Sequence, residues 1–299
     1  MHDLNLRMAC KIANWEHLAK RTYQFTACTE SAAAFQMNME RVNGLLMLPG
    51  YAFMSGGEWQ VAVKAVAERY FKDMPSDDEF EEKREEIAAL ANAARKSVLS
   101  KRTAESSMNV FYTACYNIEV FAGDFPRLHG WLHDIFKSAI IQSWTAFEVL
   151  AEDLNCGARE KHSQCFPLNV LTGKSYTFRR LEALCESFKR AFCDDAHINA
   201  VVRSKDVKTL ALLRHLLVHK GGFVDQQFLS QCSEEPVVNE FSMFGLDQEI
   251  KMNGGMVRSL VDSCTKRGYE LIKLVDDWMT AQNQHEVTPG ALGPAPRIE

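Results

Sequence analysis

Hydrophobic residues recur every three to four positions along most of the chain, with polar residues between them. This spacing places the apolar side chains on one face of an α-helix. Strand patterns are scarce: only "VVNEFSMFG" and "DQEIKMN", after Pro236, suggest a short hairpin or an irregular excursion. The predicted fold is therefore all-α, with helices over 5–24, 30–47, 58–73, 76–100, 104–121, 131–155, 177–193, 197–219 and 254–281.

Turn-forming residues divide this helical pattern into regions. The stretch "AGDFPRLHG" holds two glycines and a proline and predicts a domain boundary near residue 126. Before it, residues 1–125 form a helical region of unknown role, and after it residues 126–282 form a helical bundle. Residues 283–299 contain three of the eight prolines and almost nothing to bury, so we expect a disordered tail there.

The lengths of the apolar runs and the spacing of the cysteines indicate the cellular compartment. No window approaches the roughly 18 consecutive apolar residues of a membrane-spanning helix, and the N-terminal residues lack the apolar core of a secretory signal. The nine cysteines are scattered and include no C-x-x-C pair, which favours buried thiols in a reducing compartment. We expect a cytoplasmic protein that does not enter a membrane.

The segment "LLRHLLVHKGG", residues 212–222, places three costly polar side chains in a run of leucines. At about 100° per residue, Arg214 falls in the middle of an apolar sector formed by Val207, Leu210, Ala211, Leu217 and Val218. His215 and His219 fall together on a neighbouring face, beside Lys208. Two glycines then end the helix, so His219 lies in its last turn, where the helix dipole favours an imidazolium.

Two interpretations need no catalysis. Arg214 can pair with an acid across the core while both histidines are ordinary surface residues. Alternatively, His215 and His219, at i and i+4, can share a metal ion, although no glutamate of an H-E-x-x-H motif and no third ligand stands nearby in the sequence.

A third interpretation comes from resemblance. Arg214, the polar His215, three further residues, His219 and the trailing "GGFVD" resemble the R-x(4–6)-H signature of HEPN domains. The helix "FKSAIIQSWTAFEVLAEDL", with Glu148, and the helix "MVRSLVDSCTKRGYELIKLVDDWM" resemble the early and closing helices of that family's bundle. The resemblance covers residues 128–281, about half the chain.

The resemblance implies a metal-independent endoribonuclease that needs no cofactor and acts as a homodimer with a composite active site. Arg214 and His219 are about 140° apart on their helix, which also favours a second copy completing the site. His219 would be the general acid/base, Arg214 would stabilise the phosphate, and His215 would support them. Glu148, at the edge of its helix's apolar face, would orient Arg214 or a histidine, or would be an ordinary surface carboxylate. The products would carry 2′,3′-cyclic phosphate and 5′-hydroxyl ends.

Charge adds a candidate RNA surface. Residues 174–220 hold ten basic and five acidic residues in a chain of net charge −5. Lysines and arginines beside two aromatic residues in "GKSYTFRR" suit single-stranded RNA, although a solvated basic helix face has the same composition. The candidate RNA-binding residues are Lys174, Arg179, Arg180, Lys208 and Lys220.

The family further implies a role in toxin–antitoxin or antiviral defence systems, with a cognate antitoxin or a regulatory partner. The alternative function is a non-catalytic HEPN-type module that binds a partner protein, RNA or a nucleotide and keeps the motif for structural reasons.

Overall fold

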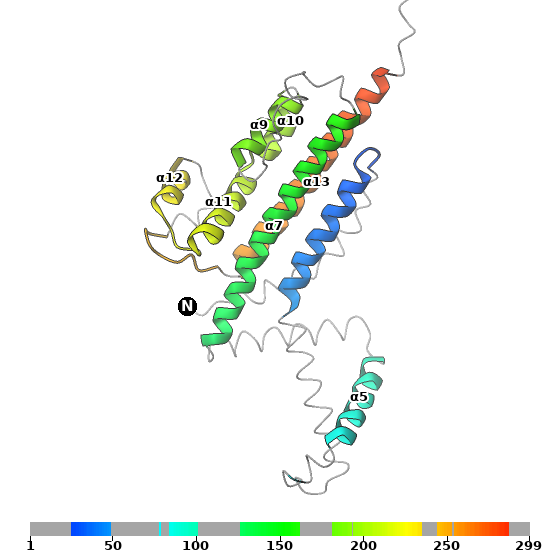
Figure 1. The fold of residues 1–299 in the computed structure, drawn as a ribbon, viewed down its shortest axis with the longest axis vertical. Coiled ribbons are helices and arrows are strands. Elements are labelled where there is room, and N and C mark those ends of the chain that lie inside the picture. The colour runs from blue at the N-terminus through cyan, green and yellow to red at the C-terminus, as the bar shows by residue number, and fades with distance from the viewer. Residues whose placement is uncertain are drawn as a thin grey trace, which may run out of the picture. The chain divides into compact units, whose positions relative to one another are not determined.

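The computed structural model describes residues 25–48, 78, 84–100, 126–161, 181–192, 194–234, 244–252 and 254–286. Every regular element in these residues is an α-helix, which confirms the all-α prediction. Besides a helix over residues 29–48, the elements are α5 (Arg84–Ser100), α7 (Pro126–Lys161), α9 (Leu181–Ala191), α10 (Ala196–Val202), α11 (Lys205–Lys220), α12 (Gln226–Glu234) and α13 (Gly254–Glu286) (Figure 1).

The chain divides into two compact units. The described part of one unit is essentially α5 with the ends of neighbouring helices, and the other unit, called the bundle below, contains α9–α12 and most of α7 and α13. The division differs from the boundary predicted at residue 126, because the helix of residues 29–48, called the N-terminal helix below, belongs to the bundle as far as residue 43. The motif of residues 212–222 lies entirely in the bundle.

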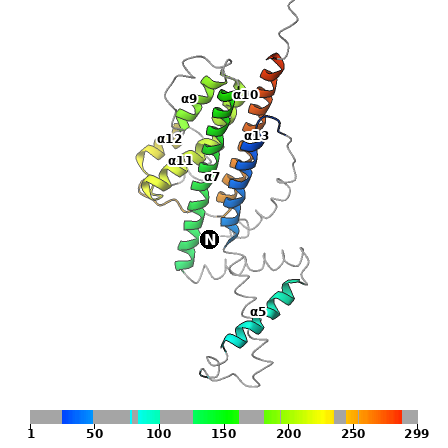
Figure 2. The ribbon, with the colours of Figure 1, turned by 45° about the vertical axis from the view of Figure 1, so that its right-hand side comes forward.

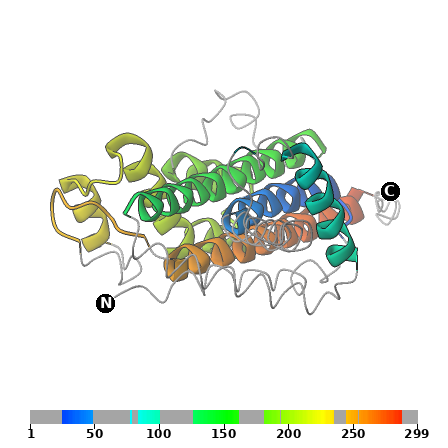
Figure 3. The same cartoon turned by 90° about the horizontal axis from the view of Figure 1, so that it is seen from below.

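Two long helices, α7 and α13, form the centre of the bundle. Figure 1 and Figure 2 show them side by side with the helix of residues 29–48, and Figure 3 shows the same three helices from below. Trp144 and Phe147 of α7 are almost fully buried. The Cys264 thiol of α13 donates to the carbonyl oxygen of Ser143 at 3.3 Å. Phe35 of the N-terminal helix lies over Gly268 of α13, where the missing side chain lets the ring approach.

A carboxylate of α13 fixes the start of the N-terminal helix. The backbone N–H groups of Thr26, Ala27 and Cys28 donate to the Asp276 carboxylate at 2.6–3.1 Å. Lys161, at the end of α7, donates to the carbonyl oxygen of Ala27 at 3.1 Å. These contacts join three segments that are far apart in the sequence, and they explain why residues 25–43 belong to the bundle.

The helix predicted over 197–219 is two helices in the structure. Asp195 caps α10 by accepting from the N–H groups of His197 and Ile198, and α10 ends at Val202, with Arg203 as its C-cap. Ser204, in extended conformation, then precedes α11. The helix predicted over 177–193 corresponds to α9 in its described part, and Phe192, just after α9, stacks edge-on against Trp278 of α13 with ring centroids 5.1 Å apart.

Other boundaries also differ from prediction. Helix α7 is longer at both ends than 131–155, α12 was not predicted, and α13 continues to Glu286, past the predicted start of the tail at residue 283. The described part of the predicted hairpin is irregular, with a single antiparallel bridge between Phe223 and Glu249. The helices predicted over 5–24, 58–73 and 104–121, and residues 287–299, lie outside the described residues.

Among the helices that the structure describes, none combines the length and apolar character needed to cross a membrane.

Candidate functional site

Helix α11 presents the motif residues from a well-anchored scaffold. Its buried side chains are Val207, Thr209, Leu210, Leu213, Leu216 and Leu217. At about 100° per residue, this face is centred near Leu213, and Arg214 lies at its border rather than in its middle as predicted. Val218, which was assigned to the apolar sector, is 45 % exposed. The helix is attached to α13 through Asp206, which accepts from Arg267 at 3.1 Å.

Arg214 is half-buried, and its Nε atom is buried without a hydrogen-bond partner. A buried N–H donor without an acceptor costs about 1–3 kcal/mol. Because the Nε atom is buried from solvent in the single chain, an anion would supply the missing acceptor, through a charge-assisted hydrogen bond, once the side chain turns outward. The arginine at the edge of the buried face is thus suited to binding a phosphate.

His215 and His219 lie on the exposed side of α11 with ring centroids 4.7 Å apart. Partial burial lowers the pKa of His215 below its ordinary value, and the nearby His219, Arg214 and Lys220 lower it further, while Asp225 opposes them. His215 is therefore biased toward the neutral imidazole near pH 7, the form that accepts a proton. The two histidines are adjacent, and Arg214 lies between them and the buried face.

The two glycines after the motif have separate structural roles. Gly221 ends α11 in the left-handed conformation, with φ of 64°, and its N–H donates to the carbonyl oxygen of Leu216. Gly222, with φ of 93°, is buried, and a methyl group there would lie 3.4 Å from Leu217 and 3.6 Å from Lys137. Both positions favour glycine because positive φ strains other residues.

The remaining residues of "GGFVD" hold the next turn in place. Val224 is buried, and Asp225 accepts from the N–H of Phe228 at the start of α12 at 2.8 Å. The hydrogen bond from Phe228, together with Lys220 at 3.5 Å, lowers the pKa of Asp225. The sequence D-Q-Q-F, with an aspartate at the N-cap, is a helix N-terminal signal, although α12 was not among the predicted helices.

A clamp connects the end of the motif to α7. The Lys137 ammonium contacts Glu249 at 2.7 Å, and its side chain packs beside Gly222. The N–H of Ile250 donates to the carbonyl oxygen of Gly222 at 2.9 Å, and the N–H of Val224 donates to that of Gln248 at 2.9 Å. The chain after His219 is therefore bound on two sides, which orients the last turn of α11.

The other predicted site residues are distributed differently. Glu148 lies half-buried on α7, and its supporting role stays a prediction. Lys208 lies half-buried on α11, and Lys220 is exposed at its end, paired with Asp225. Lys174, Arg179 and Arg180 lie outside the described residues. Within the part of the chain that the structure describes, no three His, Cys, Asp or Glu side chains gather to hold a metal ion.

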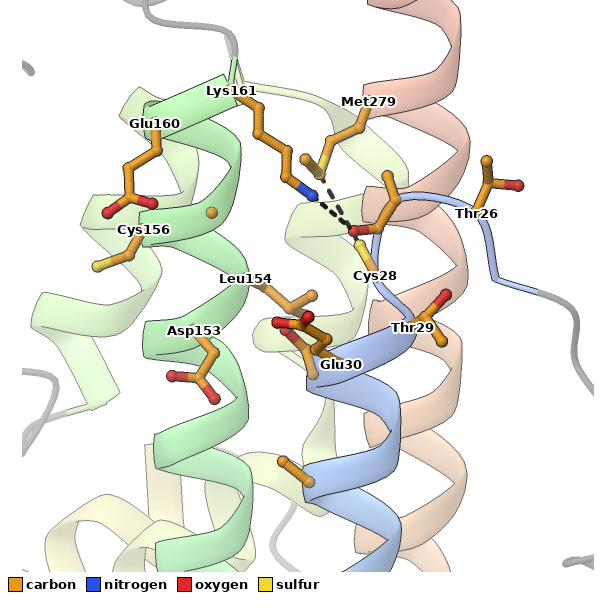
Figure 4. Close-up of a pocket in the computed structure, with 14 residues that line it drawn as sticks. Thr26, Cys28, Thr29, Glu30, Asp153, Leu154, Cys156, Glu160, Lys161 and Met279 are labelled. Atoms are coloured by element: carbon orange, nitrogen blue, oxygen red, sulfur yellow. Dashed lines mark hydrogen bonds between the residues drawn. The ribbon is translucent and has the colours of Figure 1, made fainter.

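A cavity of about 690 Å³ lies at another part of the bundle, between the N-terminal helix and the end of α7 (Figure 4). It includes Lys161, which is 24 residues after Lys137, or about 36 Å along α7. Glu30, Asp153 and Glu160 contribute carboxylates to its lining. This acidic cavity repels a phosphate backbone, and it contains none of the motif residues.

The thiols of this cavity are poor nucleophiles. Burial, followed by the charge of Asp276, raises the pKa of Cys28 to about 12. Burial also raises the pKa of Cys156, with the nearby Glu152 adding to the effect. Since the thiolate is the reactive form, neither residue supports catalysis near neutral pH.

Comparison of the chain with protein-family models, with curated proteins and with solved structures finds no match.

Proposed function

We propose that the protein is a metal-independent endoribonuclease of HEPN type. The observation that carries this proposal is the arrangement on two turns of α11: a guanidinium with an unsatisfied buried donor beside two exposed, adjacent imidazoles. An anion site next to a proton-transfer pair is the minimal equipment for RNA cleavage, because RNA supplies its own nucleophile, the 2′-hydroxyl.

The reaction has two proton transfers and one displacement. A neutral imidazole accepts the 2′-hydroxyl proton as the 2′-oxygen attacks phosphorus, and the bond from phosphorus to the 5′-oxygen breaks. An imidazolium donates a proton to that leaving oxygen, which gives a 2′,3′-cyclic phosphate and a 5′-hydroxyl. His219 is the general acid/base, Arg214 stabilises the charge on the phosphate, and His215 supports proton transfer.

A homodimer completes the proposed site. Arg214 and His219 point about 140° apart on one helix, so two copies of α11 facing each other supply both groups to one phosphate. Three exposed apolar side chains occur near the motif: Val218 in the last turn of α11, Phe223 after it, and Leu246 in the segment that pairs with residues 222–224. Their exposures of 45–52 % suit an interface between copies.

The biological role follows from the resemblance alone: an RNA-cleaving toxin or an antiviral defence protein, held in check by an antitoxin or by a regulatory partner.

The test is incubation of the full-length protein with a mixed RNA pool in EDTA, beside Arg214→Ala and His219→Ala. His197→Ala, which removes an exposed histidine of α10 outside the motif, is the matched control. We expect the parent and the control to leave cyclic-phosphate ends, and both motif variants to lose at least about 100-fold in rate. Equal cleavage by all four proteins would exclude the motif as the active site.

Oligomeric state is tested separately by analytical ultracentrifugation. The parent should sediment as a dimer, and Val218→Glu should shift it toward monomer and reduce cleavage. A parent that stays monomeric with RNA present would contradict the composite site. A dimer that binds RNA but never cleaves it would support the alternative of a non-catalytic binding module.

A further inference from the structure

A second pocket of about 430 Å³ adjoins the motif face of α11. It is bounded by α9, by Arg203 between α10 and α11, by α11 itself and by Gln231 of α12. Figure 1 and Figure 2 show these helices together on one side of α7. A volume of this size lies in the range of about 300–1,000 Å³ typical of small-molecule sites.

The pocket and the histidines share one face of α11. Lys208 and Leu212 line the pocket, and His215 and His219 continue the same stripe at i+7 and i+11 from Lys208. With a rise of 1.5 Å per residue, His215 lies about 10 Å and His219 about 16 Å along the helix from Lys208. A strand whose scissile phosphate reaches the histidines therefore places a flanking nucleotide at the pocket.

The lining combines the groups that such a nucleotide needs. Arg203 and Lys208 supply positive charge, and of the two carboxylates, Glu186 is already paired with Arg190 at 2.7 Å. Leu212 and the buried Cys185 supply apolar surface for a base. The Cys185 thiol is directed to the carbonyl oxygen of Val202 at 3.8 Å and so belongs to the pocket wall.

Two polar side chains can read the edge of a base. Gln231 offers both a donor and an acceptor, the pattern that pairs with N6 and N7 of adenine. Glu182 is a carboxylate acceptor that suits the exocyclic amino group of adenine, whereas uracil offers it only the N3–H, which lies between two carbonyl oxygens that repel a carboxylate. The lining thus matches adenine better than uracil.

We propose that this pocket binds a nucleotide flanking the scissile phosphate and gives the protein a preference for adenine there. Arg203 and Lys208 hold the phosphate, Leu212 and Cys185 contact the base, and Gln231 and Glu182 read its edge. The inference rests on the proposed nuclease function for the position of the scissile phosphate, but binding to the pocket does not depend on cleavage.

Binding is measured by fluorescence anisotropy of the full-length protein with labelled hexanucleotides whose 2′-hydroxyls are methylated and cannot react. The oligoadenylate should bind at least about fivefold tighter than the oligouridylate. Lys208→Gln and Leu212→Trp, the second of which fills the pocket, should each weaken oligoadenylate binding at least about fivefold. Gln231→Leu should reduce the preference for adenine. Lys273→Gln, an exposed lysine of α13, is the charge-matched control and should bind like the parent.

The outcomes separate the two proposals. Pocket variants that bind and cleave RNA like the parent would overturn the pocket and leave the nuclease. Loss of binding in pocket variants of a parent that cleaves nothing would support the pocket and overturn the nuclease. A parent that neither binds nor cleaves would overturn both. Circular dichroism of each variant checks that Leu212→Trp has not unfolded the bundle, and Lys208→Gln tests the same pocket with a smaller change.

Discussion

The contact between Phe35 and Gly268 predicts an unusual response to a small substitution. Gly268 lies within α13, where alanine is ordinarily better than glycine by about 1 kcal/mol. A methyl group there, however, would overlap the Phe35 ring at Cζ and Cε1 and lie 3.0 Å from Cε2. The ring is 1 % exposed and stacks edge-on against Tyr269 at 5.8 Å, so it has little room to move.

The change in the free energy of unfolding for Gly268→Ala is the difference between these two opposed effects. Overpacking a filled core costs about 1–3 kcal/mol, and a rigid, buried ring places this site at the upper end. After subtraction of the gain in helix propensity, Gly268→Ala should reduce the free energy of unfolding by about 1–2 kcal/mol. Gly157 of α7 is the matched control, because a methyl group there would meet nothing within 4 Å. Gly157→Ala should raise stability by about 0.5–1 kcal/mol.

Urea unfolding followed by circular dichroism measures both variants, with the slope of the transition checked for each. Phe35→Leu in the Gly268→Ala background should restore part of the lost stability, giving a coupling energy of about 1 kcal/mol or more in the double-mutant cycle. A Gly268→Ala protein that is as stable as Gly157→Ala, or a cycle without coupling, would refute the predicted clash with Phe35.

Three further predictions concern other contacts. Asp276→Ala removes the acceptor of three backbone N–H groups and should lower the free energy of unfolding by about 3 kcal/mol or more, which urea titration measures; a loss below about 1 kcal/mol would contradict the proposed anchoring. Lys137→Met breaks the ion pair to Glu249 and should cost about 0.5–1 kcal/mol while speeding hydrogen exchange over residues 244–252; unchanged exchange would argue against the clamp. Burial and His219 lower the pKa of His215 in the folded protein below its ordinary 6.5. Between these two pKa values the unfolded chain binds more protons at His215 than the folded chain does. The free energy of unfolding should therefore fall as the pH drops through this range. In an NMR titration, His219→Asn should raise the pKa of His215 only part of the way, since burial is the larger cause; full restoration to 6.5 would show that burial is not the main effect.

Much of the fold was predictable because helices that pack against a core have apolar residues at every third or fourth position. The all-α class and the helices at residues 29–48, α7 and α13 follow from that spacing. The break at Arg203 and Ser204 was not predicted, because the apolar periodicity continues across it and no glycine or proline marks it. The N-terminal helix was assigned to a separate region because periodicity cannot show that Asp276 would cap a helix some 250 residues earlier.

The candidate site was likewise predictable only in part. The grouping of His215 with His219 followed from their spacing, and the structure places the two rings together. The helical wheel put Arg214 in the middle of the apolar sector because it could not tell which side of α11 would meet the bundle. Leu213 and Leu216 on one side are buried, whereas Val218 on the other is half-exposed. The pocket beside Lys208 was not predictable, since its walls come from helices whose packing no local pattern records.

The hydrogen bonds from residues 26–28 to Asp276 have a consequence for synthesis of the protein. Translation produces the helix of residues 29–48 well before its anchoring carboxylate on α13, so the bundle cannot close until α13 has left the ribosome. Until then, Phe35 and Met39 have no completed core to enter. A fragment that starts near residue 126 would omit this helix and uncover the α13 surface around Gly268.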